Sequence, residues 1–383
     1  MQQLSIGVVM PGYDARGLPA VTDLLSAMGR EHDVRVVALR HPPPGPAFDG
    51  GGFMVHRLGA GADKGMSGRG RVLALGVRAI VRLHAQRPFD VLHALWADEA
   101  GAVAVLAGRL LRRRVVVSVM GGELAALPDV GYGAALGRGG RWSVGVALRG
   151  ADLVTCGSST MHDAVADRVP AKRLAMAPLG VDLDLFSPGP PTSSAGRRTV
   201  LSVGSLEPVK DHVTLLRAIA LVAGGRPDLR LQLVGDGTLR SPLERLAERL
   251  GVAGSVEFLG RLPRERLPDL YRSATILCLS SRHEAQSMAA VEAAACGLPV
   301  VGTRVGCLPD LGDGAQTVPV GDHRSLAAAM SDVLDDPEAR RRMGGAARAA
   351  AIANYGIDAV PARWSEFYNG SSSDGRGGSG GVQ

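Results

Sequence analysis

Short runs of valine, leucine and isoleucine alternate along the chain with longer amphipathic stretches of helical periodicity. The apolar runs predict strands buried on both faces, and the amphipathic stretches, such as 18–29 and 71–85, predict helices between parallel strands. This alternation favours a doubly wound α/β fold. Strands are predicted at 4–10, 34–39, 53–57, 91–95, 115–119, 153–156, 199–203, 229–234, 256–258, 276–279 and 300–302.

The length of 383 residues predicts two domains rather than one. A segment rich in proline and glycine at 177–191 precedes the point where the strand pattern restarts. We therefore predict Rossmann-like domains at 1–180 and 193–355 with a linker at 181–192. A helix at 356–369 is expected to return to the N-terminal domain, and the low-complexity tail at 370–383 is expected to be disordered.

Composition excludes several classes of protein. Hydrophobic residues make up 46% and charged residues 21% of the chain, which argues against wholesale disorder. A spanning helix needs about 20 consecutive apolar residues, and the sequence holds none; its start also lacks the basic segment of a signal peptide. The four cysteines form no metal-ligand spacing. We expect a cytoplasmic protein with free buried thiols and no bound metal.

The net charge is +6, and residues 1–187 hold most of the excess, with 21 Lys and Arg against 16 Asp and Glu. The basic residues are not interleaved with aromatic residues, and the sequence has no zinc-finger spacing. Both observations argue against nucleic acid as a partner. One helix face carries Arg71, Arg78 and Arg82, opposite Leu73, Val77 and Ile80. That face could contact an anionic membrane surface at the inner side of the membrane, or it could simply be solvated.

Two acidic residues, Glu284 and Glu292, flank a predicted helix start near 286–287. On a helix they would lie ~12 Å apart along the axis, and with Glu284 in the preceding loop both could face one extended ligand. The free N–H groups at 286–289 between them offer a phosphate site. A nucleotide-sugar could bind the two carboxylates and the N–H groups between them. The alternative is a surface helix on which both carboxylates are solvated, which has the same spacing.

Lys210 is one of only three lysines among 43 basic residues, the others being Lys64 and Lys172. It lies where a loop meets a helix, beyond the predicted strand 199–203. A compact ammonium group at that position suggests phosphate binding, and a solvated lysine is the alternative.

These segments resemble the C-terminal half of retaining glycosyltransferases of family four, the glycosyl transferases group 1, which have the GT-B fold of two Rossmann-like domains facing a cleft. The Glu-x7-Glu motif is Glu284–Glu292, and an Ala-rich helix-to-strand run follows at 293–301. A G-x-L-x-x-x-K loop is present at 204–210, and residues 180–186 resemble the interdomain connector. The resemblance covers most of residues 4–368.

The resemblance implies a role for each motif. Lys210 would bind the diphosphate of the donor, Glu292 the ribose hydroxyls and Glu284 the transferred sugar, so that Lys210 and Glu284 are the catalytic candidates. The base would stack near 259–261. The implied donor-binding residues are Gly204, Ser205, Lys210, Leu259, Arg261, Glu284, Gln286, Ser287, Met288 and Glu292. Neither a cofactor nor a metal ion is implied, since cationic groups and helix dipoles neutralise the leaving diphosphate.

The first half resembles the family's acceptor-side domain, with Gly12 and Gly17 in the opening loop and Met120 and Gly121 after the strand 115–119. His93 lies within a predicted buried strand, so we expect a structural role for it. Three positions depart from the family pattern. Met120 replaces a common histidine, Ser205 replaces a basic residue, and 285–287 reads Ala-Gln-Ser where a glycine is usual.

The sequence therefore predicts a retaining, metal-independent glycosyltransferase that uses a nucleotide-diphosphate sugar and front-face attack. Its acceptor is not identified and could be a glycan, a lipid-linked molecule or a small molecule. The alternative is a non-catalytic nucleotide-sugar binder or a partner subunit of an active transferase, suggested by Met120 and Ser205. A dinucleotide-binding oxidoreductase is disfavoured because the Gly-Asp-Gly at 235–237 lacks the third glycine of the fingerprint.

Overall fold

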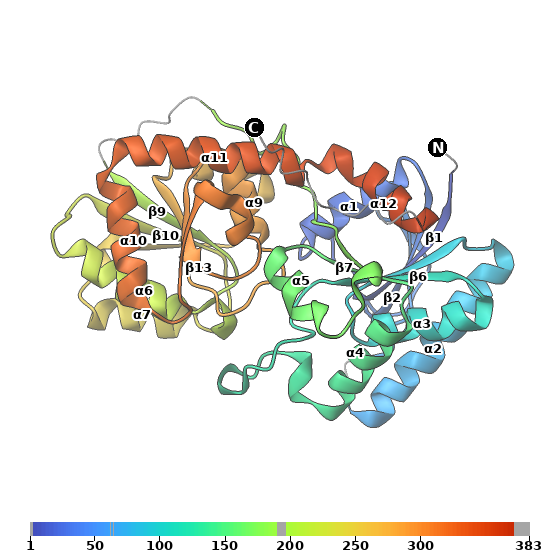
Figure 1. Ribbon diagram of the computed structural model, residues 1–383. Helices are drawn as coiled ribbons and strands as arrows, with labels where there is room; N and C mark the ends of the chain where they lie inside the picture. The colour runs from blue at the N-terminus through green and yellow to red at the C-terminus, as the bar shows by residue number, and fades with distance from the viewer. Residues whose placement is uncertain (1–2, 62, 64, 190–196, 371–383) are drawn as a thin grey trace. The chain divides into compact units, whose positions relative to one another are not determined.

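The computed structural model describes residues 3–61, 63, 65–189 and 197–370. The chain divides into an N-terminal unit, Met1–Leu179 with Asp358–Gln383, and a C-terminal unit, Gly180–Ile357 (Figure 1). The end of the predicted linker at 190–192 and the predicted tail from 371 onward lie outside the described residues.

The N-terminal unit is built on an eight-stranded sheet with the order β3-β4-β2-β1-β5-β6-β7-β8. Its strands pair in parallel except for β3, which runs antiparallel to β4. The strands are β1 (Ser5–Gly12), β2 (Asp33–His41), β3 (Phe48–Asp49), β4 (Met54–Arg57), β5 (Val91–Leu95), β6 (Arg114–Val119), β7 (Leu153–Cys156) and β8 (Leu174–Met176).

Helices cover both faces of this sheet (Figure 1). On one face α2 packs against α3 and α3 against α4, while α1 packs against the C-terminal helix α12 on the other. The helices are α1 (Pro19–Gly29), α2 (Met66–Gln86), α3 (Glu99–Leu111), α4 (Arg138–Gly150), α5 (Ser159–Ala166) and α12 (Val360–Asn369).

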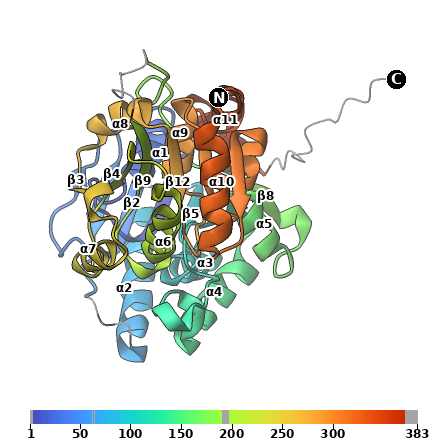
Figure 2. The ribbon, with the colours of Figure 1, turned by 90° about the vertical axis from the view of Figure 1, so that its left-hand side faces the viewer.

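The C-terminal unit is built on a six-stranded parallel sheet with the order β11-β10-β9-β12-β13-β14 (Figure 2). Its strands are β9 (Arg198–Val203), β10 (Leu229–Val234), β11 (Val256–Gly260), β12 (Ile276–Leu279), β13 (Val300–Thr303) and β14 (Ala315–Val318). Its helices are α6 (His212–Ala223), α7 (Arg240–Arg249), α8 (Leu267–Ser273), α9 (Met288–Ala295), α10 (His323–Asp335) and α11 (Pro337–Tyr355).

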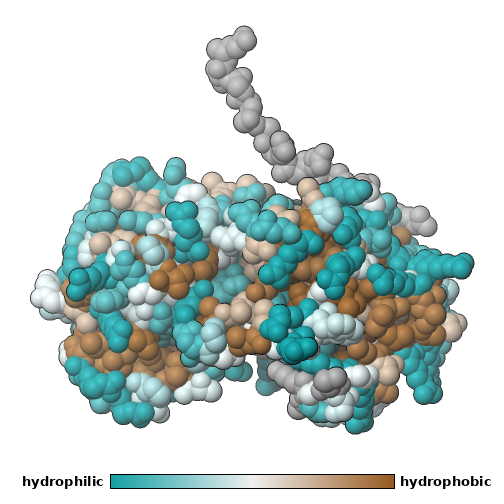
Figure 3. Space-filling model, turned by 60° about the horizontal axis from the view of Figure 1, so that its bottom comes forward, coloured by the Kyte–Doolittle hydropathy of each residue, from teal (hydrophilic) through white to brown (hydrophobic). Residues whose placement is uncertain are grey.

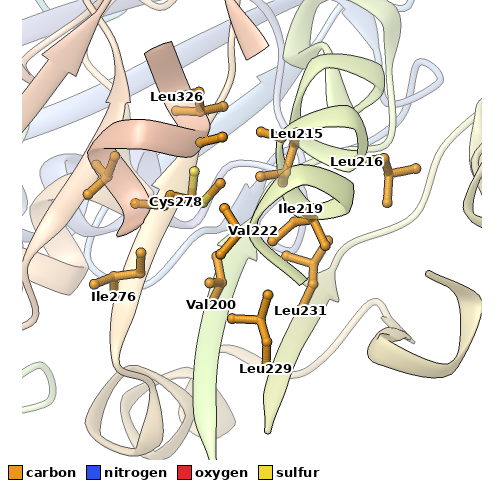
Figure 4. Close-up of a cluster of buried hydrophobic side chains, with 14 of the residues drawn as sticks. Val200, Leu215, Leu216, Ile219, Val222, Leu229, Leu231, Ile276, Cys278 and Leu326 are labelled. Atoms are coloured by element: carbon orange, nitrogen blue, oxygen red, sulfur yellow. The ribbon is translucent and has the colours of Figure 1, made fainter. Parts of the chain in front are cut away.

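Neighbouring residues of the C-terminal strands point into two different cores. Val200 lies in one core cluster, beside Val222 of α6 and together with Leu326 of α10 (Figure 4). Leu201, the next residue of β9, packs on the other face with α8, α9 and α11. Successive strand residues point to opposite faces, so a sheet covered on both sides needs uninterrupted apolar runs. This is why the sequence showed such runs rather than alternation.

The differences from the predicted elements are at the margins. Strands β3, β8 and β14 were not predicted. They are edge strands of two to four residues and lack the run of valine, leucine and isoleucine that marks the interior strands. Helix α2 begins at Met66, five residues before the predicted start. The prediction missed this first turn because glycine and serine are poor helix formers. The segment between β6 and α4 contains two short 3-10 helices, Pro128–Val130 and Ala134–Leu136.

His93 joins the N-terminal sheet to the last helix. Its Nδ1 lies 2.8 Å from the hydroxyl of Tyr368 on α12, and its Nε2 lies 2.8 Å from the hydroxyl of Ser118 on β6. The ring is fully buried against Trp364. Burial lowers the pKa of His93 to about 3, so the imidazole is neutral. His93 therefore has a structural role.

Candidate functional site

The order of strands in the C-terminal sheet reverses between β9 and β12. From β9 the chain builds outward through β10 to β11, and it then returns to build β12, β13 and β14 on the other side. The loops that leave β9 and β12 lie on either side of this reversal at the carboxyl end of the sheet, which is where ligands bind in folds of this kind.

Lys210 and Glu284 meet at this point. The ammonium Nζ of Lys210 lies 2.5 Å from Oε1 of Glu284, although the two residues are 74 positions apart in the sequence. The hydroxyl of Ser281 donates to the same oxygen at 2.6 Å. The side chains are 26% exposed for Lys210 and 12% for Glu284. The ion pair is thus partly shielded but reachable from solvent.

Main-chain contacts hold the two loops together. The N–H of Arg282 donates to the carbonyl of Val209 at 2.8 Å, and the hydroxyl of Ser280 donates to the carbonyl of Lys210 at 2.9 Å. Lys210 ends a 3-10 turn, and Asp211 follows in the left-handed region at φ 48° and caps α6. The position of the ammonium group is therefore set by the backbone on both sides of it.

Helix α9 begins beside this ion pair. Ser287 precedes it with φ 74°, and the side chain of Ser287 does not cap its first turn. The first amides of a helix have no partner inside the helix, and they carry the positive end of its dipole. Gly306, at φ 57°, lies against the loop before the helix, where a Cβ would come within 2.7 Å of the carbonyl of Gln286. Gly306 thus packs closely against the loop that precedes α9.

Glu292 lies on α9, about one turn after its start at Met288, and is buried. The hydroxyl of Tyr271 on α8 donates to Oε2 of Glu292 at 2.9 Å. Burial and the nearby carboxylate raise the pKa of Tyr271 well above its usual range, so it stays a donor. Tyr271 was not among the predicted residues, because nothing in the sequence separates it from an ordinary core tyrosine.

The remaining predicted donor residues follow other strands of the same sheet. Gly204 and Ser205 come directly after β9, and the N–H of Gly204 donates to the carbonyl of Val234 at 2.9 Å. Ser205 is exposed. Leu259 lies half-buried near the end of the edge strand β11, and Arg261 is exposed just beyond it. In a parallel sheet these positions share the edge that carries Lys210 and Glu284.

His212 follows Lys210 closely but adds no charge to this site. It is buried, and burial together with the Lys210 charge lowers the pKa of His212 to about 4. The C-terminal site therefore brings together the ammonium of Lys210, the carboxylate of Glu284 and the first amides of α9. An anionic ligand could bind the ammonium group of Lys210 and displace the carboxylate of Glu284 from it.

The N-terminal sheet reverses its order between β1 and β5, and a cavity of about 530 Å³ lies among the loops near this point. Two aromatic, two cationic and three acidic side chains contribute to its wall. The residues that line it are Pro11, Arg40, His41, Arg69, Trp96, Asp98, Glu99, Gly122, Glu123, Gly131, Tyr132, Gly133, Ala134, Gly137 and Gly140.

Two of the acids have pKa values shifted upward. Burial, strengthened by Glu123 and Glu99, raises the pKa of Asp98 to about 7, although the N–H of Ala100 donates to its Oδ1 at 2.9 Å. Burial also raises the pKa of Glu123. Asp98 therefore exchanges its proton near neutral pH.

The predicted acceptor-side residues surround this cavity rather than line it. The N–H groups of Met120 and Gly121 donate to the carboxylate of Glu123 at 2.9 and 2.6 Å. Gly12 lies at the end of β1, where a Cβ would come within 2.0 Å of the His41 ring. Gly17 is exposed beside Asp14. Met120, Gly121 and Gly12 therefore lie in or next to the loops whose neighbouring residues form the wall of the cavity.

Sequence reasoning missed Trp96, Asp98, Glu99 and Glu123. All four follow predicted strands, β5 or β6, so their position after a strand was the signal that could have found them. Trp96 also adopts φ 82°, which is unusual for a bulky residue. That conformation is invisible in the sequence.

Helix α2 also borders a shallow apolar groove with α3. Of the three apolar residues named opposite the arginines, Ile80 is buried, whereas Leu73 and Val77 are half-buried. Val72, Gly76 and Ile80, spaced four apart, take the buried positions. The groove is lined by Gly70, Leu73, Ala74, Val77, Arg78, Val81, Leu106 and Leu110.

Apolar and charged residues lie side by side around this groove. Leu110 is 66% exposed, and the predicted arginines Arg71, Arg78 and Arg82 are exposed on α2. Figure 3 shows hydrophobic and hydrophilic areas next to each other on the face that includes the lower part of Figure 1, where α2 and α4 lie. In the part of the chain that the structure describes, no helix is long and apolar enough to cross a membrane.

The four cysteines are buried free thiols. Across the described residues, no three acidic, histidine or cysteine side chains gather in a way that could hold a metal ion.

Two family descriptions match this chain. Residues 188–350 match the glycosyl transferases group 1, and residues 19–180 match the glycosyl transferase 4-like domain.

Among curated proteins, the chain is 33% identical over 229 residues to the MMP alpha-(1->4)-mannosyltransferase of Mycolicibacterium hassiacum, covering 58% of this chain and 55% of the relative. It is 31% identical over 309 residues to the GDP-mannose-dependent alpha-(1-6)-phosphatidylinositol monomannoside mannosyltransferase of Mycolicibacterium smegmatis, covering 73% and 77%. The chain spans about half the length of most curated relatives that it matches.

Among solved structures, the sucrose-phosphate synthase of Thermosynechococcus elongatus is similar with a TM-score of 0.79 and 22% identity, over 95% of this chain and 98% of that one. HepE of Anabaena, solved with UDP and glucose, is similar with a TM-score of 0.77 and 19% identity, over 96% and 100%. These likenesses concern the fold.

Proposed function

The chain belongs to the glycosyl transferases group 1, with the two parallel-sheet units of the GT-B fold, and on that premise we propose that it transfers a sugar from a nucleotide-diphosphate sugar to an acceptor hydroxyl. The transfer retains the anomeric configuration and uses no metal ion. The observation that carries this proposal is the Lys210–Glu284 pair at the point where the C-terminal sheet reverses, beside the start of α9.

The donor diphosphate takes the place of Glu284 as the partner of Lys210. The ammonium group and the first amides of α9 then neutralise the charge that grows on the leaving diphosphate as the bond from the anomeric carbon to the phosphate oxygen breaks. These groups are fixed by the backbone, so little reorganisation is needed. The proposal of a metal-independent reaction rests on this supply of positive charge.

Glu284 and Glu292 bind the two ends of the donor. Glu284, released from Lys210, lies beside the sugar and tolerates the positive charge that develops at the anomeric carbon. Glu292, oriented by Tyr271, accepts hydrogen bonds from the ribose hydroxyls. The new bond to the acceptor oxygen forms on the face from which the diphosphate leaves, and the leaving phosphate takes the acceptor's proton. No protein nucleophile is needed.

GDP-mannose and UDP-glucose are the first donors to test. The relative from M. smegmatis is named as GDP-mannose-dependent, and HepE was solved with UDP and glucose. Both are nucleotide-diphosphate sugars, which is the class that the C-terminal site fits.

The experiment is an assay of donor binding and of sugar release with the purified chain and each donor. We expect turnover with at least one donor, and a loss of about 100-fold or more in Lys210→Ala. Lys172→Ala changes an exposed lysine of the N-terminal unit and should leave turnover unchanged. Binding without any turnover would favour the non-catalytic alternative, which Met120 and Ser205 still support. Absence of binding would refute the proposal.

We also propose that the α2–α3 groove contacts an anionic membrane surface. The exposed Leu106 and Leu110 offer apolar area, and the neighbouring arginines attract anionic headgroups. Sedimentation with vesicles of phosphatidylglycerol and phosphatidylcholine tests it. Arg78→Glu should reduce the bound fraction, whereas Arg245→Glu, an exposed change on α7, should not. Equal binding to pure phosphatidylcholine would contradict the electrostatic part.

A further inference from the structure

Two donors hold the carboxylate of Glu284, and both contact the same oxygen. The ammonium of Lys210 lies 2.5 Å from Oε1, and the hydroxyl of Ser281 donates to Oε1 at 2.6 Å. The second distance is typical of a hydrogen bond from a hydroxyl to an ionised carboxylate. Across the residues that the structure describes, no donor contacts Oε2, and the side chain is partly exposed. Oε2 can therefore accept from a ligand while Oε1 stays bound to the protein.

Ser281 is itself held in place by the strands of the sheet. It lies just after β12 and is only 1% exposed. Its carbonyl accepts from the hydroxyl of Thr303, the last residue of β13, at 2.6 Å, and Thr303 is fully buried. Gly306 packs against Glu284, where a Cβ would come within 2.8 Å of the Glu284 Cβ. These contacts leave the Glu284 side chain little room to move away from Ser281.

The two donors respond differently to a bound diphosphate. Lys210 is 26% exposed, and a diphosphate that binds its ammonium group displaces the carboxylate of Glu284 from it. Ser281 is buried, so its hydroxyl is not open to the same competition and keeps its hydrogen bond. Once the donor is bound, the hydrogen bond from Ser281 is therefore the contact that still holds Oε1 of Glu284.

We propose that Ser281 is a positioning residue for the transfer: its hydroxyl holds Oε1 of Glu284 after the diphosphate has taken Lys210, and Oε2 stays directed toward the sugar. The inference rests on the proposed function, because it needs a donor that displaces Glu284 from Lys210. Ser281 does not touch the donor and acts through Glu284. A carboxylate whose orientation is fixed in advance stabilises the charge at the anomeric carbon without reorganising during the reaction.

The first test is the steady-state kinetics of Ser281→Ala in the full chain, with the donor that turns over. We expect kcat to fall about tenfold or more, because a hydrogen bond to a charged group is lost. The KM of the donor should stay within about threefold, because Lys210 and the amides of α9 are unchanged. Ser273→Ala removes a half-buried hydroxyl on α8 that bonds to the carbonyl of Leu270, and it should leave both constants unchanged. A folded Ser281→Ala with the kcat of the wild type overturns the inference.

A double-mutant cycle tests whether Ser281 acts through Glu284. Glu284→Ala removes the acceptor, so adding Ser281→Ala to it should lower kcat by a further factor of about two at most. In Glu248→Ala, an exposed change on α7, Ser281→Ala should keep its full effect. Equal losses in the two backgrounds would assign Ser281 a role in the fold alone and overturn the inference. If Ser281→Ala does not fold, Ser281→Cys takes its place in every measurement, because the thiol has nearly the same shape but is a weak donor.

Calorimetry separates failure of this inference from failure of the proposed function. Ser281→Ala should bind GDP or UDP as the wild type does, but it should bind the matching GDP-mannose or UDP-glucose about twofold to threefold more weakly, because Glu284 contacts the sugar. If the wild type turns over donor and Ser281→Ala changes neither kcat nor this ratio of affinities, the role of Ser281 alone is refuted. If the wild type binds donor without turnover, the transfer is refuted, and the ratio of affinities decides the role of Ser281. If the wild type binds no donor, both are refuted.

Discussion

The C-terminal and N-terminal units each gather polar side chains where the order of their parallel sheet reverses, yet they balance charge differently. In the C-terminal unit a single ammonium group, Lys210, faces a single carboxylate, Glu284, and free helix amides lie beside them. In the N-terminal unit two guanidinium groups share Glu99, and Asp98 and Glu123 add further acid. One topology therefore supports two sites with different sets of charged groups. The fold decides where ligands bind, and the local charge balance decides which ligands.

The largest expected effect concerns the carboxylate that neutralises Lys210. Glu284→Gln should lower turnover by about 100-fold or more, since the group beside the anomeric carbon loses its charge. The same variant should bind GDP or UDP about tenfold more tightly, because the diphosphate no longer competes with a carboxylate for Lys210. Turnover assays and calorimetry measure the two effects. Glu248→Gln serves as the control, and weaker nucleotide binding in Glu284→Gln would contradict the proposed exchange.

The next effect concerns stability in the N-terminal unit. Glu123→Ala leaves the N–H groups of Ala97, Met120 and Gly121 without their acceptor, and we expect a loss of about 2–4 kcal/mol in the free energy of unfolding. Chemical denaturation gives the size of the loss, and hydrogen exchange at these three amides locates it. Glu248→Ala should be nearly neutral. Unchanged protection at the three amides would show that Glu123 does not hold this loop.

Asp98 makes stability depend on pH. Its pKa is about 7 in the folded chain, above its value in an unfolded chain, so the folded state keeps a proton that the unfolded state releases between about pH 4 and pH 7. Stability therefore falls as the pH rises through this window. Asp98→Asn removes the penalty and still caps α3, so its Tm should exceed that of the wild type by about 3–6 °C at pH 8.

The gain in Asp98→Asn should shrink as the pH falls toward 4, where the wild-type carboxyl is protonated in both states. Thermal melting at several pH values checks this. Asp313→Asn, an exposed change in the C-terminal unit, should show no such trend. A gain that is constant with pH would assign the effect to packing rather than to charge.

The smallest expected effect adds a cation to the C-terminal site. Ser205→Arg should tighten binding of GDP or UDP by about twofold to fivefold, an amount typical of an exposed charge pair, and the gain should disappear at high salt. Ser241→Arg places the same charge on α7 and should have no effect at either salt concentration. A gain that survives high salt would point to a contact other than an ion pair.

The sequence by itself determined the two parallel sheets, because their strands are buried on both faces and so appear as uninterrupted apolar runs. It also determined that Lys210, Glu284 and the start of α9 lie where loops meet helices, because these positions follow the carboxyl ends of strands. Such signals are local and depend only on residues that are close in the chain.

Only the tertiary structure decided which of these groups meet. The strand order brings Lys210 to Glu284 across 74 residues and Arg40 to Glu99 across 59. It also buries Asp98 near two other acids and thereby moves the pKa of Asp98 toward neutrality. Hydrogen bonding and desolvation depend on neighbours from distant segments, so no pattern within one segment could reveal that two N-terminal guanidinium groups share the carboxylate of Glu99.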